Sequence, residues 1–530
     1  MTGRAAQRRA SVKGVLLSLA EPAMLAVLIL YLLYEFLLSH VEGDQAYLLY
    51  AAQQVLHGVQ LDGPRLVETN PPFIVWFSVV PAALAQVLHL DAVLALRLVV
   101  LAMLATSAAW GARLLRLSGL TLRLGGRLGR TLWAATFLLI VVTQPAEFGQ
   151  REQLLLALLL PYLLAVGAGV VKQLGAFERV ALGVCVGSAV CFKPQHLITL
   201  VCLELFLALY TRALRRLWTP EVLAAVVTGL LYVAAVRVFT PTYLTVITPL
   251  LQSTYWALGE YTDAEMLLRV GRSLTFATLV LGAVWIAVRK RLMLPQLTGA
   301  ILATAAGAFL AYVVQHTGWY HQRFPAVALL EIGTVWIAAD LLSPRLHHIE
   351  TRGWLRKAAW IVLPLYAVAA FAAVLIHKRH AQPATDDMTA ELARVAPGTT
   401  VYAFSVGMNA FPVVMERHLV WGSRFAHLWM LPAIRANEVP APAGRSVHHL
   451  EPTRVTELSA LQRSETTEDL QRTQPSLVFV ERCDAQHACE SYSRPFNAVQ
   501  WFSQDASFAQ VWSQYRLDRS SEGFDVYRRR

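Results

Sequence analysis

Acidic and amide side chains gather in a short stretch between two apolar runs. Residues 40–76 read HVEGDQAYLLYAAQQVLHGVQLDGPRLVETNPPFIVW and place Asp44 and Glu68 ahead of a Pro71-Pro72 break. A carboxylate close to a reacting hydroxyl can take up its proton as a general base. The density of polar groups in this stretch, Asp44 and Glu68 among them, indicates an active-site loop and not a simple connector. The simpler alternative is that Asp44 only caps the helix predicted for residues 45–56, a role worth about 1 kcal/mol.

A second polar group lies where a later apolar run begins. Residues 144–152, QPAEFGQRE, carry Glu147, Arg151 and Glu152. Carboxylates and a guanidinium can orient the hydroxyl groups of a substrate through hydrogen bonds. Arg151 could equally pair with a neighbouring carboxylate and tie the loop to a helix end. The sequence leaves both interpretations open.

Cationic and aromatic side chains interrupt the apolar pattern twice more. Lys193 lies in CFKPQ, and the segment QHTGWYHQRFP carries Trp319, Tyr320, His321 and Arg323. Arginine can bind an anionic oxyacid with two parallel N–H groups. The alternatives are that Lys193 extends its amine toward the membrane interface and that the aromatic residues form an interfacial belt.

The composition fixes the class of protein that must position these groups. The chain has 530 residues, of which 56% are hydrophobic and 15% charged, with a mean hydropathy of +0.47. This is typical of a polytopic membrane protein, because a helix needs roughly 20 apolar residues to cross a bilayer. We expect about eleven spans, near residues 15–38, 92–112, 131–145, 153–171, 179–192, 196–211, 221–239, 272–288, 297–314, 324–341 and 358–376.

Basic residues indicate the orientation. They cluster at the ends of apolar runs and not in one stripe, so the formal net charge of +11 predicts a positive-inside bias and no nucleic-acid partner. With the N-terminus inside and the C-terminus outside, every polar segment described above falls on the external side. This requires residues 71–90, which contain Pro71, Pro72 and Pro81, to be an external interfacial or re-entrant piece and not a span.

The composition changes near residue 377. We therefore predict a transmembrane domain over 1–376 and an external soluble α/β domain over 377–530. In the second, residues 399–406 and 476–480 read as strands, 388–395 and 506–515 as helices, and 515–527 as a hairpin. Cys483 and Cys489 could form a disulfide in an oxidising compartment, although spacing alone does not give the geometry.

The membrane part, roughly residues 15–340, resembles a known superfamily. A first span, an external Asp44 followed by an amphipathic helix, and the acid of ETNPPFIVW at 68–76 are similar to GT-C type glycosyltransferases, especially protein O-mannosyltransferases and lipid A aminoarabinose transferases. The resemblance implies a sugar donor carried on polyprenyl phosphate, transfer on the external face and inversion at the anomeric carbon. It also implies a place in the bacterial inner membrane with the site on the periplasmic side.

The resemblance gives each candidate group a role. Asp44 matches the first-loop acid and would be the general base, with Glu68 as runner-up. The remaining residues would hold the donor phosphate (Lys193, His321, Arg323) or the sugar and acceptor hydroxyls (Glu147, Arg151, Glu152, Trp319, Tyr320). We expect no metal and no cofactor, because one acid and several cations suffice for a lipid-phosphate donor; a divalent cation at Glu42-Gly43-Asp44 is the open alternative.

Two other functions compete with this interpretation. A transporter or lipid flippase would carry buried ionisable residues within its spans, and Glu35, Arg97, Glu204 and Glu331 are scattered exceptions. A ligase or polymerase of undecaprenyl-diphosphate glycans would share the donor chemistry. The sequence does not identify the sugar, or whether the acceptor is a protein, a lipid or a polysaccharide.

Overall fold

The computed structural model describes residues 22–120, 126–142, 148–259, 261–342, 387–438, 450–484 and 495–530. These residues form two compact units, each assembled from several segments of the chain. The first draws on Met1–Ser39, Leu96–Val233 and Thr262–Ala381, and the second on His40–Ala95, Ala234–Tyr261 and Gln382–Arg530. Each unit is described by itself.

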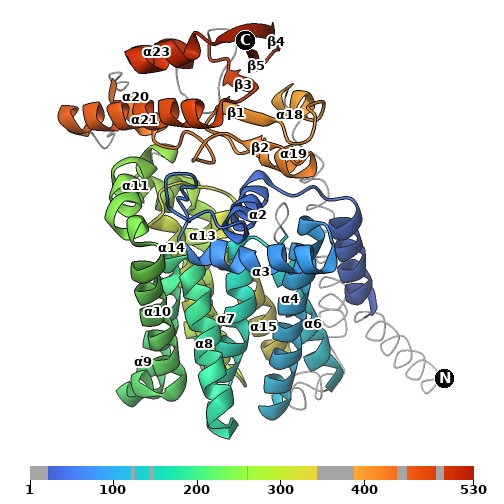
Figure 1. Ribbon diagram of the computed structural model, residues 1–530. Coiled ribbons are helices and arrows are strands. Elements are labelled where there is room, and N and C mark those ends of the chain that lie inside the picture. Colours follow the sequence, from blue (N-terminus) through green and yellow to red (C-terminus); the bar gives the residue numbers. More distant parts are fainter. Residues whose placement is uncertain are drawn as a thin grey trace, which may run out of the picture. The chain divides into compact units, whose positions relative to one another are not determined.

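The first unit is a bundle of long apolar helices. In Figure 1 the axes of helices α4, α6, α7, α8 and α9 are nearly aligned with one another. Their bounds, with those of the helices that complete the unit, are Pro22–Leu37, α4 (Ala92–Leu117), α6 (Gly126–Val142), α7 (Arg151–Gly167), α8 (Ala176–Phe192), α9 (Leu197–Thr211), α10 (Pro220–Phe239), α13 (Arg272–Val288), α14 (Pro295–Val313) and α15 (Phe324–Leu342).

Helix α14 forms the centre of this bundle. It packs against α7, α9, α13 and α15, and most of its residues are buried. Helices α9, α10 and α13 instead leave large apolar side chains exposed, such as Leu209, Leu230 and Phe276. Exposed apolar surface on helices of this length fits contact with lipid. Gly183 and Gly187 let α8 approach α10 closely, because a Cβ at Gly183 would lie 2.2 Å from the Glu221 carbonyl oxygen.

Six helices in the described residues are long and apolar enough to cross a membrane. They are Ala92–Leu117, Pro194–Thr211, Pro220–Phe239, Arg272–Arg291, Pro295–Val313 and His321–Leu341. The protein is therefore an integral, multi-pass membrane protein, whereas the count of about eleven spans stays a prediction. The predicted last span at 358–376 lies outside the described residues.

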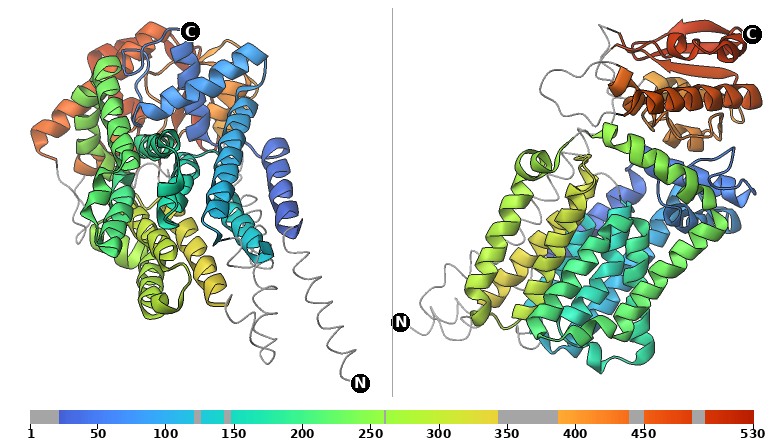
Figure 2. Two further views of the ribbon diagram at one scale, coloured as in Figure 1. Left: turned by 90° about the horizontal axis from the view of Figure 1, so that it is seen from below. Right: turned by 90° about the vertical axis from the view of Figure 1, so that its left-hand side faces the viewer.

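The second unit combines the C-terminal α/β fold with the segments at 40–95 and 234–261. Its sheet has the order β2-β1-β3-β5-β4, parallel from β2 to β3 and antiparallel from β3 to β4. The strands are β1 (Thr400–Phe404), β2 (Val420–Trp421), β3 (Leu477–Glu481), β4 (Tyr515–Ser520) and β5 (Phe524–Arg529). The C-terminal helices are α18 (Asp387–Leu392), α19 (Phe411–Glu416), α20 (Leu431–Glu438), α21 (Pro452–Thr473), α22 (Ala498–Phe502) and α23 (Ala506–Trp512). Helix α21 extends alongside the sheet in the right-hand view of Figure 2.

The predicted α/β character of the C-terminal part is confirmed. The strands expected at 399–406 and 476–480 are β1 and β3, the helices expected at 388–395 and 506–515 are α18 and α23, and the hairpin is β4 with β5. The long helix α21 was not predicted. Its side chains are mostly polar, so it lacks the apolar stripe on which such predictions rest.

The loop at residues 40–76 and the C-terminal fold share one hydrophobic core. Val67, Ile247 and Leu250 pack with Phe404, Trp429 and the other buried residues around the sheet. Helices α2 (Gly43–Leu56) and α3 (Phe73–Leu88) pack against each other, and α2 also packs against α19. The predicted boundary between 376 and 377 divides the chain at a single point. The second compact unit also takes in two earlier segments, His40–Ala95 and Ala234–Tyr261.

Candidate functional site

The N-terminal end of α2 carries Asp44 in its first turn. The capping position belongs to Glu42, whose side chain makes no capping hydrogen bond, so the interpretation of Asp44 as a helix cap is wrong. The positive end of the helix dipole favours the charged form of a carboxylate in this turn. Gln45, the next residue of the helix, is buried, because α3 and α19 pack against α2.

The acids of this loop act electrostatically on Tyr47, a fully buried residue on α2. The charges of Glu68, Asp62 and Asp44 all act on the Tyr47 hydroxyl and, after burial itself, raise its pKa well above the usual range. The hydroxyl donates a hydrogen bond of 3.1 Å to the Val67 carbonyl oxygen. We call Asp44, Asp62 and Glu68 the acid cluster.

Hydrogen bonds fix two members of the acid cluster. Glu68 is 2% exposed, and its Oε1 accepts bonds from the backbone N and the Nδ2 of Asn70, at 2.7 and 2.8 Å. Asp62 accepts a bond of 3.1 Å from the Glu68 N–H. Burial raises the pKa of Asp62 to about 7, against the effect of that N–H. The two carboxyl groups are thus held in place, and Asp62 is partly protonated near neutral pH.

Sequence reasoning missed Asp62 and His427. Asp62 lies in Leu-Asp-Gly-Pro, which reads as an ordinary turn, and its φ of 57° fits a turn residue. His427 belongs to the C-terminal part, in the segment between β2 and α20. Asp44 is the charge that acts on His427. Nothing in the sequence signals this electrostatic effect, because the two residues are far apart along the chain.

A second group of charged residues lies in the first unit, around Glu152. The side chains of Arg151, Glu152 and Lys193 are all buried, and the Lys193 amine forms an ion pair with a Glu152 carboxylate oxygen. The cations whose charges act on Glu152 are Lys193, His321 and Arg151. We call Arg151, Lys193 and His321 the cation cluster. The loops at 148–152, 193–196 and 316–323 are therefore brought together as expected.

Helix ends position these groups. Helix α7 begins at Arg151, where the Gln150 side chain accepts a bond from the Arg151 N–H, so Glu152 lies in the first turn. Lys193 is the extended residue that ends α8, because the following Pro194 disfavours helical backbone before it. Helices α7 and α8 pack together, and α14 contacts both the 3₁₀ turn Pro194–His196 and the turn His321–Arg323.

The aromatic residues of the loop at 316–323 lie against its cations. The Arg323 guanidinium lies 4.1 Å from the centre of the Tyr320 ring, and the rings of Trp319 and His321 are 5.7 Å apart. Trp319 and Tyr320 are 37% and 45% exposed, so their faces remain accessible. His316 contacts Asp263 at 3.4 Å and ties this loop to the segment at 262–265.

Two predicted site residues fall elsewhere. Glu147 and Cys489 lie outside the described residues. Cys483 itself is buried at a bridge with Phe496 and is disulfide-bonded, whereas its pairing with Cys489 stays a prediction. Among the described residues, no group of three or more His, Cys, Asp or Glu side chains is arranged to hold a metal ion.

The described residues thus form a membrane protein with a helical bundle and an α/β fold. In comparisons with known proteins, no protein-family model and no curated protein matches the chain. The crystal structure of ArnT from Cupriavidus metallidurans bound to undecaprenyl phosphate matches with a TM-score of 0.53 and 13% identity, over 95% of this chain and 97% of that one. The fold that the sequence resemblance predicted is thus confirmed: the chain has an ArnT-like fold.

A second solved structure is more distant. The Archaeoglobus fulgidus oligosaccharyltransferase, in complex with Zn and sulfate, matches with a TM-score of 0.44 and 13% identity, over 97% of this chain and 73% of that one. At identities this low a shared fold does not transfer activity or residue roles. These have to be argued from the two charged clusters.

Proposed function

We propose that the protein is a membrane glycosyltransferase that moves a sugar from a polyprenyl-phosphate donor to an acceptor hydroxyl, with inversion. The observation that carries this proposal is the likeness to ArnT over almost the whole chain, in a structure bound to undecaprenyl phosphate. It is supported by a set of acids and a separate set of cations, each held by loops that follow or precede apolar helices.

Asp44 is the proposed general base. In the reaction, the acceptor oxygen attacks the anomeric carbon, the bond from that carbon to the phosphate oxygen breaks, and the phosphate leaves with the electron pair. The acceptor proton passes to the Asp44 carboxylate. Glu68 is the runner-up, but its Oε1 already accepts two bonds from Asn70, which makes a fixed, orienting carboxylate the better role for it.

The cations are proposed to stabilise the leaving phosphate. Developing negative charge is stabilised most by donors that are already in place, and Lys193, His321 and Arg323 are assigned to this task. Glu152 keeps Lys193 compensated before the donor binds. Arg151, Glu152, Trp319 and Tyr320, with Glu147, are assigned to the sugar and acceptor hydroxyls. A site of this kind requires no metal ion, and a divalent cation near Glu42 and Asp44 stays the alternative.

The location follows from the same proposal. The basic ends of the apolar runs put the N-terminus inside and the acid-bearing loop outside, in a bacterial inner membrane with a periplasmic site. The acceptor remains one of three classes: a protein, a lipid or a polysaccharide. The second unit, which contains Asp44 and the C-terminal fold, is proposed to position it.

Two measurements test the proposal. Mass spectrometry of the lipid that copurifies should find a polyprenyl monophosphate sugar; a diphosphate-linked glycan would favour the ligase or polymerase alternative. In membranes, Asp44→Asn should lose transfer of labelled sugar while the protein folds normally. Full transfer by this variant would remove Asp44 from the mechanism. Lipid movement in vesicles without any acceptor would favour the flippase.

A further inference from the structure

One segment of the C-terminal fold lies between the sheet and the first external loop. We call Ser423–Met430 the His427 segment. The Val67 N–H donates to the Arg424 carbonyl oxygen at 2.8 Å, and Val67 and Phe425 form a parallel bridge. On the other side, the Leu428 N–H donates to the Ser405 carbonyl oxygen at 3.0 Å. The segment is therefore fixed both to the loop that contains Val67 and to the chain that follows β1 at Ser405.

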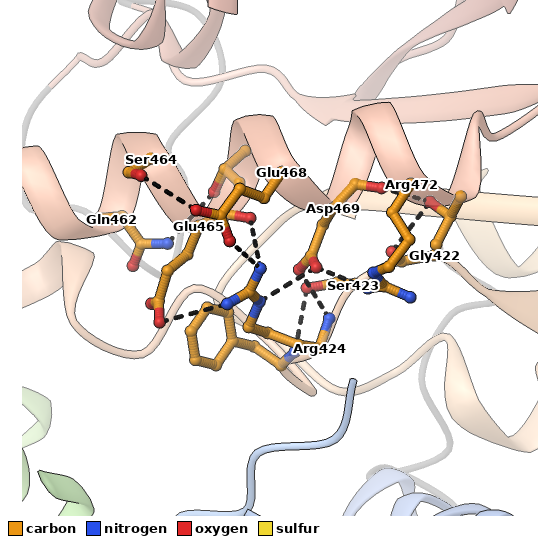
Figure 3. A network of polar contacts seen from close by, with 12 residues as sticks. Gly422, Ser423, Arg424, Gln462, Ser464, Glu465, Glu468, Asp469 and Arg472 are labelled. Carbon is orange, nitrogen blue, oxygen red and sulfur yellow. Dashed lines mark hydrogen bonds and ion pairs between the residues drawn. The ribbon is translucent and has the colours of Figure 1, made fainter. Parts of the chain in front are cut away.

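Arg424 anchors this segment to α21 (Figure 3). Its backbone N–H and its Nε donate to the two carboxylate oxygens of Asp469, at 2.7 and 3.0 Å. Its guanidinium also contacts Glu468 at 2.8 Å and Glu465 at 3.4 Å. Asp469 is fully buried. A buried, multiply bonded arginine three residues before His427 leaves the backbone of the segment little freedom.

The beginning of α2 is held by the same C-terminal fold. A Cβ at Gly43 would lie 2.4 Å from the Met408 carbonyl oxygen, so only glycine permits this approach next to Asp44. The rings of Tyr47 and Phe411 meet edge to face at 4.7 Å. The Trp421 N–H donates to the Tyr50 hydroxyl at 3.2 Å. Asp44 and His427 are thus both positioned from one rigid frame.

The chemical state of His427 suits a partner of a carboxylate. Its Nδ1 is buried and has no hydrogen-bond partner among the described residues. Burial lowers the pKa of His427 to about 4, and the charge of Asp44 opposes this effect. At neutral pH the ring is therefore neutral, with one nitrogen as a donor and one as an acceptor.

We propose that His427 is a positioning residue for Asp44, supplied to the first-loop acids by the C-terminal fold. Resting on the proposed function, this assigns to the neutral imidazole the task of holding the carboxylate in the orientation that receives the acceptor proton. The C-terminal fold would then complete the catalytic site and not only bind the acceptor. Arg424 serves the same purpose indirectly, because it fixes the segment that carries His427.

Substitution of His427 tests the catalytic part. His427→Phe keeps a ring but removes both nitrogens, and should lower kcat roughly ten- to a hundredfold, the effect of losing a hydrogen bond to a charged group, with the donor KM unchanged. His427→Gln keeps an amide donor and should lose less. Unchanged kcat in His427→Phe would overturn the proposal. An equal loss in both variants would also overturn it, because that result points to a proton carried by His427.

A double-mutant cycle tests the proposed interaction of Asp44 with His427 without any activity. The Tm shifts of Asp44→Asn and His427→Gln should fail to add by roughly 2–4 °C in the double variant. The matched control pairs Asp44→Asn with His57→Gln, at the exposed end of α2, where the shifts should add. Additive shifts in the first pair would overturn the proposal. Coupling in a protein that transfers no sugar would instead refute the proposed function and leave the contact standing.

Discussion

At the scale of residues, the Lys193–Glu152 ion pair decides how the cation cluster can work. Both side chains are buried, and a charge left alone there costs about 3–5 kcal/mol. The lysine predicted to hold a phosphate is therefore also needed to stabilise the fold. A donor phosphate would compete with Glu152 for the same amine, so donor binding and protein stability should be linked through this pair.

Lys193→Met should lower the free energy of unfolding by about 3–5 kcal/mol, because Glu152 stays buried without its partner. Adding Glu152→Gln should recover part of this loss, since the carboxylate that lost the Lys193 amine is then removed. Thermal unfolding in detergent measures both variants. Arg454→Met, which breaks an exposed pair with Glu457, is the control and should change stability by less than about 1 kcal/mol. If Lys193→Met alone were as stable as the wild type, the result would contradict the burial of the Lys193–Glu152 pair.

Asp62 predicts a dependence of stability on pH. Its pKa is raised from 3.8 to about 7 in the folded protein, so between these values the folded state binds more protons than the unfolded state. Its contribution to stability therefore falls as the pH rises from about 4 to 7. Asp62→Asn should remove this loss. The stability that the variant gains over the wild type should therefore be larger at pH 8 than at pH 4, by at most about 4 kcal/mol.

The measurement is Tm against pH for both proteins. The control is Asp505. The Ser507 hydroxyl and the backbone N–H groups of Ser507 and Phe508 donate to its carboxylate and lower its pKa, so Asp505→Asn should change the pH dependence of stability in the opposite direction. If Asp62→Asn and the wild type followed parallel curves, Asp62 would titrate normally and would not lie in the acid cluster as described.

At the scale of elements, local sequence patterns predicted helices, strands and turns better than they predicted contacts between distant segments. The break at Lys193-Pro194, the strands β1 and β3 and the hairpin of β4 and β5 follow from turn chemistry and apolar alternation. His427 and Asp62 could not be found in this way, because their roles depend on packing between segments that are hundreds of residues apart or on burial alone. The acid cluster was thus only partly predicted.

Helix α2 depends on one glycine for its contact with the C-terminal fold. Gly43→Ala would place a Cβ 2.4 Å from the Met408 carbonyl oxygen, a backbone atom that cannot move easily. We expect a loss of about 1–3 kcal/mol in stability, the usual cost of overpacking, and a larger loss of transfer activity, because Asp44 is the next residue. Gly523→Ala, where a Cβ would meet no atom within 4 Å, is the control.

Thermal unfolding and transfer assays on the two glycine variants separate the effects. Equal behaviour of Gly43→Ala and Gly523→Ala would mean that α2 does not press against Met408. A stability loss with normal transfer would mean that the orientation of Asp44 does not depend on this contact.

At the scale of the whole molecule, the division into two compact units predicts how the protein opens locally. Residues 40–95, residues 234–261 and the C-terminal fold belong to one unit with one hydrophobic core, in which Phe404 is 1% exposed. Regions that share a core tend to open as one cooperative unit. Truncation of that core should therefore affect α2 as well as the strands, although α2 is separated from them by the whole bundle along the chain.

Phe404→Ala should lower the stability of the second unit by about 3–5 kcal/mol. Hydrogen–deuterium exchange should then accelerate in α2 and β3 together and stay unchanged in α14, the buried centre of the first unit. The matched control is Phe309→Ala, a truncation at a residue 4% exposed in α14. It should accelerate exchange in the helical bundle and leave α2 protected. If Phe404→Ala released the strands but not α2, the first loop would not belong to the C-terminal core, and the site could not depend on the C-terminal fold through His427.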